Sequence, residues 1–181
     1  MSTFVAHAVT AYALTRVHPD ALARRRPVVL AAMACAMGPD LDVIAFAFGI
    51  PYEHVLGHRG LTHSLVFAAL LALVPAGSLL RREALGWLRR TGLFLLLFLA
   101  TASHGAIDAL TDGGLGIAFF APFDTARYFL PWQPLTVPPI GIRPMFSDWG
   151  LAVVTSELLY VGIPSIVLIA AAATRRRMPR Q

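Results

Sequence analysis

Long apolar runs dominate the chain and predict the helices from which it is built. Five stretches are rich in apolar residues: 3–17, 27–49, 62–80, 91–110 and 150–173. Several of them approach the roughly 20 residues that cross the hydrocarbon core of a bilayer. Residues 111–149 are instead rich in Pro, Gly and aromatic residues, which favours loop or interfacial structure. The pattern predicts an all-α integral membrane bundle with four or five hydrophobic helices.

The composition agrees with a membrane protein and argues against two other classes. Hydrophobic residues make up 57% of the 181 residues and charged residues 14%, and the mean hydropathy is +0.67. Soluble domains are about a quarter charged. The net charge of +5 comes from arginines that gather beside apolar runs, which argues against a nucleic-acid partner. The single cysteine, Cys35, excludes an internal disulfide and a zinc site built on thiolates.

The arginine clusters also predict the orientation of the chain in the membrane. Short loops rich in Arg stay in the cytoplasm, which places the 18–26 connection, the 81–90 loop and the C-terminal tail inside. If the first stretch also crosses, the N-terminus lies outside. Nearly every potential metal ligand then falls on the extracytoplasmic side, with His18 the exception among the histidines. We therefore expect one membrane-embedded domain over 1–173, with its polar site at the extracytoplasmic end, and a basic cytoplasmic tail over 174–181.

The motif "SHGAIDALTDGG", residues 103–114, is the strongest local signal of chemistry. His104 and Asp108 are four residues apart and share one helix face, on which Thr111 also falls. A His and an Asp one turn apart can bind one divalent cation, or one of them can orient the other. The alternative is a His–Asp pair that satisfies itself between helices, although ionisable groups inside a membrane are costly and usually functional.

The motif "GPDLD", residues 38–42, brings two more carboxylates. Gly38 and Pro39 predict the end of a helix, and Asp40 and Asp42 then lie in a non-helical stretch with their side chains in different directions. One of them can bind a metal while the other holds a histidine or a second ion. The alternative is a turn that stops one helix, with an aspartate that caps it.

The motif "HVLGHRGLTHS", residues 54–64, gathers three histidines in a glycine-containing loop. His58 and His63 are better ligand candidates than His54, which we expect to be more exposed. Thr62 is expected to cap the helix that begins near His63. Arg59 suits a phosphate or a carboxylate, and pairing with one of the aspartates is the alternative.

His7 stands alone on an apolar helix, where it is either a buried, hydrogen-bonded residue or a ligand at the same depth as the other motifs. The candidate ligands as a whole are imidazoles and carboxylates, which suit zinc, manganese or iron, and they suffice for two ions. The aromatic stretch 117–134 reads as an interfacial belt, in which Asp124 and Arg127 can pair, or as a lid that admits a lipid sideways.

Together these motifs resemble the YdjM-like inner-membrane proteins, a bacterial family whose members are described as membrane-bound metal-dependent hydrolases. "APFDTARYFLPWQP" is also similar to that family, so that the resemblance covers residues 1–165. A looser similarity links the order of the motifs to the bacterial zinc-dependent phospholipases C, which are all-helical. This chain lacks the later HxxxE motif of those enzymes, which leaves the number of metal ions open. The resemblance implies these metal-site residues: His7, Asp40, His58, His63, His104 and Asp108.

The leading hypothesis is a multi-pass inner-membrane hydrolase that cleaves an ester or phosphoester of a membrane lipid or lipid-linked substrate through metal-activated water. In it Asp42 or Asp112 supports a ligand or acts as general base, and Arg59 neutralises substrate phosphate. The alternative is a metal-stabilised scaffold, or a regulator of another membrane protein, with a closed ligand shell. Ion or proton transport would need polar residues along 64–80 and 91–102, which contain almost none.

Overall fold

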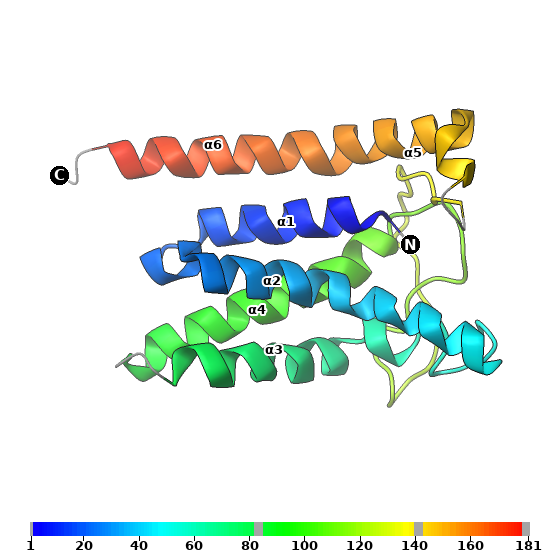
Figure 1. Ribbon diagram of the computed structural model, residues 1–181, viewed down its shortest axis with the longest axis horizontal. Helices are drawn as coiled ribbons and strands as arrows, with labels where there is room; N and C mark the ends of the chain where they lie inside the picture. The colour runs from blue at the N-terminus through cyan, green and yellow to red at the C-terminus, as the bar shows by residue number, and fades with distance from the viewer. Residues whose placement is uncertain (1, 82–84, 140–142, 179–181) are drawn as a thin grey trace.

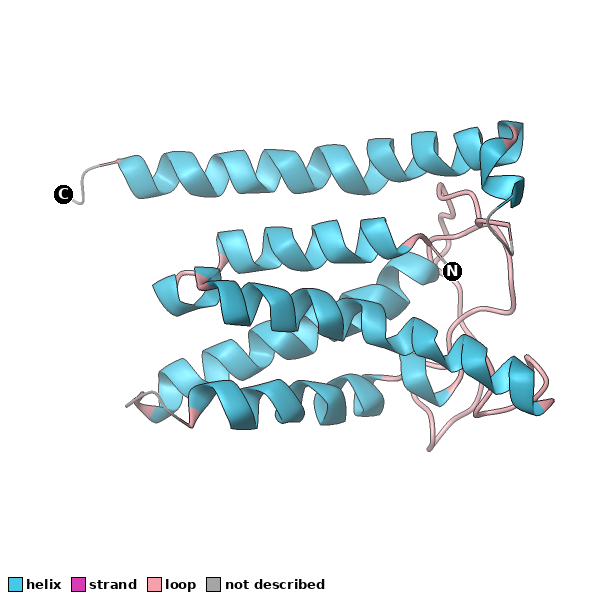
Figure 2. Ribbon diagram, in the orientation of Figure 1, coloured by secondary structure: helices cyan, strands magenta, loops and turns pink. Residues whose placement is uncertain are grey.

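The computed structural model describes residues 2–81, 85–139 and 143–178, which form a helical bundle without β-strands in these ranges (Figures 1 and 2). The α-helices are α1 (Phe4–Val17), α2 (Arg26–Met37), α3 (Leu65–Leu80), α4 (Trp87–Asp108), α5 (Asp148–Glu157) and α6 (Ile163–Arg177). The 3₁₀ segments are η1 (Ala21–Arg24), η2 (Gly38–Phe48), η3 (Leu61–His63) and η4 (Arg143–Phe146), and the π-helical turn η5 (Leu158–Gly162) joins α5 to α6. The prediction of an all-α bundle with four or five hydrophobic helices is confirmed.

Three helical segments are long and apolar enough to cross a membrane: Arg26–Phe48, Trp87–Asp108 and Asp148–Arg177. A shorter apolar segment covers Leu65–Leu79. Helix α1 has 14 residues, which corresponds to about 21 Å and is less than the roughly 30 Å hydrocarbon core. Because α1 packs against α2, α4 and α6, its polar residues His7 and Thr15 are buried inside the bundle.

Small side chains fill the interior of the bundle, and large apolar side chains cover its outside. Five alanines on four helices are almost completely buried: Ala11, Ala32, Ala36, Ala72 and Ala100. Their size lets neighbouring helices approach closely, as is common between membrane helices. Many leucines, valines and phenylalanines point outward instead, among them Leu70 and Val167. This distribution fits a bundle whose outer surface faces lipid.

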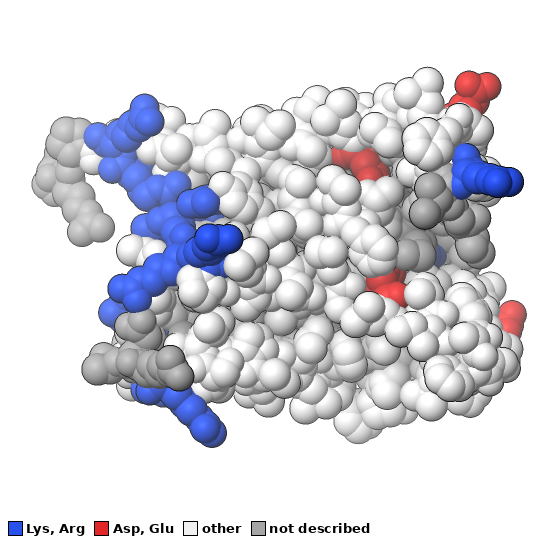
Figure 3. Space-filling view, viewed as in Figure 1, with Lys and Arg blue, Asp and Glu red and all other residues white. Residues whose placement is uncertain are grey.

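The two ends of the bundle differ in charge and in the length of their connections (Figures 1 and 3). Arginines gather at the end where α1, α3 and α6 finish and where α2 and α4 begin, which we call the arginine end. The long loops, including 49–64 and 109–139, lie at the other end, which we call the loop end. The predicted tail 174–181 begins within α6, which continues to Arg177. Residues 179–181 and Arg82 lie outside the described residues.

Two local predictions differ from the structure. The α-helical hydrogen bonding does end at Met37, but the chain continues as the 3₁₀ helix η2 and not as a non-helical stretch, and it stops at Gly49 with φ 72°. The cap of α3 is Ser64, whose hydroxyl accepts from the N–H of Phe67 at 3.1 Å. Thr62 does not cap that helix, because it lies one turn earlier and donates to Asp42.

Candidate metal centre

Four candidate ligands meet in the interior at the loop end of the bundle. Asp40 comes from η2, His63 from η3, and His104 and Asp108 from consecutive turns of α4. One ligand atom of each lies within 4.8 Å of the others, and all four residues are buried. We call these residues the Asp40 group. Their approach depends on the packing of α2 and η3 against α4.

The distances within the Asp40 group fit the spacing of ligands around one ion. His104 Nε2 lies 3.3 Å from Asp40 Oδ1 and 3.8 Å from Asp108 Oδ2. His63 Nε2 lies 3.7 Å and 3.6 Å from the same two oxygens, and 2.9 Å from His104 Nε2. Bonds of about 2.0–2.2 Å to a metal place neighbouring ligand atoms about 3–3.5 Å apart. The measured separations are equal to these values or within a few tenths of an ångström of them, so the four residues could hold a single divalent ion.

Hydrogen bonds at the far side of each imidazole set the protonation of the two histidines. His104 Nδ1 lies 2.7 Å from the carbonyl oxygen of Ala36, which can only accept, so Nδ1 carries the proton. His63 Nδ1 lies 3.1 Å from Thr62 Oγ1, whose own proton goes to Asp42, and 3.2 Å from Asp42 Oδ2, so it is held in the same way. Both Nε2 atoms then point at the centre of the group, where they lie within hydrogen-bond distance of each other. This is the arrangement of metal-binding histidines, whose other nitrogen donates to a carbonyl or a carboxylate.

Asp40 stands out in the group because its carboxylate is the less satisfied one. Among the described residues, neither side-chain oxygen of Asp40 accepts a hydrogen bond, although Asp40 is completely buried. The buried carboxylates of Asp40, Asp42 and Asp108 lie in the same region, and the buried guanidinium of Arg59 lies 3.5 Å from Asp108. The centre therefore favours a cation, and a divalent metal ion fits both the donors and the charge.

A second polar group surrounds Asp42, whose carboxylate, unlike that of Asp40, is satisfied by neighbouring donors. Asp42 Oδ1 lies 2.6 Å from His58 Nδ1. Its Oδ2 accepts from the hydroxyl of Thr62 at 2.5 Å and from the N–H of Arg59 at 3.2 Å, in addition to facing His63. Asp42, His58 and His63 also have metal-ligand spacing. The donors already present make Asp42 a support for His63.

Arg59 holds the loop end together from a strained position. It is completely buried and has φ 62°, a conformation that non-glycine residues rarely adopt. Its Nη1 donates to the carbonyl of Gly113 at 2.7 Å and its Nη2 to the hydroxyl of Thr111 at 2.8 Å, while Nε lies 3.5 Å from Asp108 Oδ2. The guanidinium is thus occupied by the protein, which corresponds to the predicted alternative of pairing with an aspartate and disfavours contact with a substrate phosphate.

His7 flanks the Asp40 group from α1. Its ring stacks on that of His104 with centroids 3.7 Å apart, and its Nε2 lies 3.5 Å from Asp108 Oδ1 and 4.0 Å from Asp40 Oδ2. These are the carboxylate oxygens that face away from His63. His7 Nε2 also lies 2.9 Å from Ser2 Oγ. The structure therefore brings His7 to the centre, on the opposite side of the two carboxylates.

Sequence reasoning missed the residues that fix the N-terminal segment at this centre. Ser2 is completely buried, and its N–H and hydroxyl both donate to Asp108 Oδ1. Thr3 donates through its N–H and its hydroxyl to the carboxylate of Glu157, which is buried at the end of α5. Glu157 could have been found as a lone carboxylate inside an apolar segment. Ser2 carries no comparable signal in the sequence.

Other candidates lie away from the centre. His54 is exposed, and Asp112 is exposed with its carboxylate accepting from the N–H of Val137 at 2.8 Å. The predicted pairing of Asp124 with Arg127 is wrong. Arg127 instead donates to the carbonyls of His58 at 3.0 Å and Tyr52 at 2.9 Å, because the aromatic stretch folds back over the histidine loop.

Comparisons with known proteins agree on one family. The family model described as YdjM inner membrane protein matches residues 1–178. The chain is 39% identical over 150 residues to the inner membrane protein YbcI of Escherichia coli (strain K12), an alignment that covers 83% of this chain and 85% of that protein. No solved structure matches the chain significantly.

Proposed function

We propose that this chain, which belongs to the YdjM inner membrane protein family, is a membrane-bound metal-dependent hydrolase. The observation that carries the proposal is the Asp40 group: two imidazole nitrogens and the carboxylate oxygens of Asp40, which accept no hydrogen bond from the described residues, converge in a buried site. If this part of the bundle served only stability, apolar side chains would be expected at these positions, because a buried charge without a partner is costly.

Asp40, His63, His104 and Asp108 would hold the ion, and zinc, manganese or iron suits this donor set. When bound, such an ion lowers the pKa of water and polarises a carbonyl or phosphoryl oxygen. Asp42 keeps the proton of His63 on Nδ1, so that Nε2 stays available. His58 braces Asp42 from the other side. We therefore assign His58 to the support of the ligands, and we assign Arg59 to the orientation and partial neutralisation of Asp108.

The substrate proposed is an ester or phosphoester of a lipid or lipid-linked molecule. Support comes from the surroundings of the loop end, where large aromatic side chains such as Phe123, Trp132 and Phe146 are exposed. Aromatic residues favour the interface between membrane and water, where lipid head groups lie. The arginine end lies opposite the loop end, where the centre is found (Figures 1 and 3), and the rule that arginine-rich loops stay inside supports an extracytoplasmic centre in a bacterial inner membrane.

A non-enzymatic role is the second candidate, and the burial of the centre favours it. The side chains of all four residues in the Asp40 group are 0% exposed to solvent. A structural ion has a closed ligand shell, whereas a catalytic ion keeps an open position. In this case the ion would lock the helices of a scaffold or of a regulator of another membrane protein.

The deciding experiment is metal analysis of the purified protein followed by a substrate panel. Wild type should contain a stoichiometric divalent ion, and His104→Ala should lose most of it; the absence of an ion in wild type would remove both candidates. The metal-loaded protein is then assayed on phospholipid and lipid-phosphate esters, with Asp108→Asn as the variant. Turnover that disappears in Asp108→Asn while the helical circular dichroism is retained supports the hydrolase. Stoichiometric metal without turnover on any member of the panel favours the scaffold.

A further inference from the structure

A groove at the arginine end suggests a ligand site that is independent of the metal centre. It lies between the end of α1 and the C-terminal half of α6 and has a volume of about 570 Å³. Val17, Leu168, Ala171 and Ala172 form apolar walls, and the other lining residues include His18, Arg175 and Arg176. The groove thus combines an apolar part between two helices with a basic part at their ends.

The positive charge of the arginine end favours an anionic ligand. Arginines gather at this end of the molecule (Figure 3). Among the described residues, Asp20, which caps η1, is the carboxylate at this end. Asp20 already binds the guanidinium of Arg89 through two hydrogen bonds of 2.6 Å and 2.8 Å, and this contact with Arg89 holds the pKa of Asp20 well below its usual range. Asp20 is therefore not a partner for the arginines of α6.

The basic residues of the groove differ in what they already contact. Arg176 donates to the carbonyl of Arg16, which ties α6 to the last turn of α1. Arg175 has no hydrogen-bond or ion-pair partner among the described residues. His18 Nδ1 accepts from the N–H of Asp20 at 3.2 Å, which leaves the proton on Nε2 and makes the ring a donor. Arg175 and His18 are thus the groups available to an anionic ligand.

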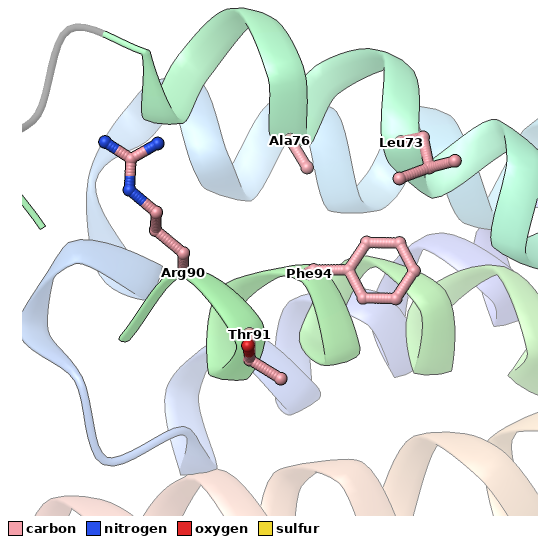
Figure 4. A pocket seen from close by; sticks show the side chains of 5 residues that line it. All are labelled: Leu73, Ala76, Arg90, Thr91 and Phe94. Atoms are coloured by element: carbon pink, nitrogen blue, oxygen red, sulfur yellow. The ribbon is translucent and has the colours of Figure 1, made fainter. Parts of the chain in front are cut away.

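A second groove shows what distinguishes the first. It lies between α3 and α4, has a volume of about 270 Å³ and is lined by Leu73, Ala76, Arg90, Thr91 and Phe94 (Figure 4). Its guanidinium is engaged, because Arg90 Nε donates to the carbonyl of Leu85 at 3.0 Å. The α1/α6 groove is about twice as large and offers a guanidinium without a partner.

We propose that the α1/α6 groove binds an anionic phospholipid, with Arg175 and His18 on the head-group phosphate and the start of an acyl chain against Leu168 and Ala171. The helices on both sides are apolar outside, and arginines mark the level of the head groups. Basic pockets between membrane helices on the cytoplasmic side suit anionic head groups, and each arginine near that surface contributes about fivefold in affinity.

The test is native mass spectrometry of the full-length protein in detergent, titrated with dioleoylphosphatidylglycerol or with dioleoylphosphatidylcholine. Wild type should retain phosphatidylglycerol in preference to phosphatidylcholine, and Arg175→Gln should weaken that binding by about fivefold. Arg177→Gln is the matched control, because it removes the same charge two residues away from a position outside the lining. Equal losses in both variants would overturn the proposal, since they would indicate attraction by the whole arginine end.

A second pair of variants tests the apolar part without changing charge. Ala171→Trp fills the groove, whereas Ala170→Trp adds the same side chain at an exposed neighbouring position outside the lining. Ala171→Trp should lower phosphatidylglycerol binding and Ala170→Trp should leave it unchanged. Inorganic phosphate at millimolar concentration should not displace the lipid, because it lacks the acyl chain. Full displacement by phosphate, or unchanged lipid binding in Ala171→Trp, would contradict a lipid site.

Discussion

Asp40 and Asp42 lie two residues apart on η2, and their carboxylates face two different polar groups. Asp42 accepts hydrogen bonds from Thr62 and from the backbone of Arg59, and it contacts His58 and His63. Asp40 is more deeply buried and accepts no hydrogen bond from the described residues. The carboxylate of Asp42 thus has hydrogen-bond donors around it, whereas that of Asp40, in the same motif, has none among the described residues. A buried carboxylate without donors is suited to bind a cation, whereas a buried carboxylate with several donors is suited to support its neighbours.

The comparison is tested most strongly by Asp40→Asn. This substitution removes a negatively charged ligand candidate and should weaken divalent-metal binding by more than the roughly 100-fold that outer partners contribute. Isothermal titration of the metal-free protein with zinc measures the effect, and thermal unfolding checks that the variant is folded. Zinc affinity equal to that of wild type would show that Asp40 does not bind the ion.

The companion variant is Asp42→Asn, for which we expect a smaller effect. The ion would keep its ligands, but His63 would lose the acceptor that fixes its Nδ1 proton, and metal affinity should fall by about 10- to 100-fold. The same titration measures it. If Asp42→Asn abolishes binding as completely as Asp40→Asn, the Asp42 group is itself the ligand set and the assignment of the two groups is reversed.

A third variant, Glu157→Ala, acts at a distance from both groups. It removes the acceptor of two hydrogen bonds from Thr3 and should cost about 2 kcal/mol in the free energy of unfolding. Because Ser2 would then be held less firmly against Asp108, metal affinity should fall by severalfold. Thermal unfolding with and without zinc gives both quantities.

The matched variant Glu157→Gln keeps one acceptor oxygen in the same place and should recover part of the stability lost in Glu157→Ala. Equal destabilisation by the two substitutions would indicate that the charge of Glu157 matters more than its contacts with Thr3.

The smallest effects are expected at the candidates that lie away from the centre. His54→Ala and Asp112→Asn change exposed side chains and should alter stability by no more than about 0.5 kcal/mol, with unchanged zinc stoichiometry. A loss of bound zinc in Asp112→Asn would show that the loop around Asp112 reaches the centre in solution.

Much of the centre could be predicted because the relevant signals are local. The spacing of His104 and Asp108 places both on one face of a helix. The arginine clusters at the ends of successive apolar stretches predict which helix ends lie on the same side of the membrane. The sequence could not show which of Asp40 and Asp42 is the ligand candidate and which is the support, since this depends on where the loop that carries His58 and Thr62 folds. The clamp of Thr3 on Glu157 joins residues 154 positions apart, and no periodicity reports a contact over such a separation.

The sequence by itself determined the all-α membrane class, the helix ends at which polar residues collect, and the types of donor available. These follow from hydrophobic length, charge placement and composition, which act residue by residue. The tertiary structure alone decided which imidazole nitrogen carries a proton, which aspartate lacks donors, and that Arg59 is turned inward onto Asp108. These properties depend on distances between separate elements, and the free energy of a buried charge is set by the partners that packing brings to it.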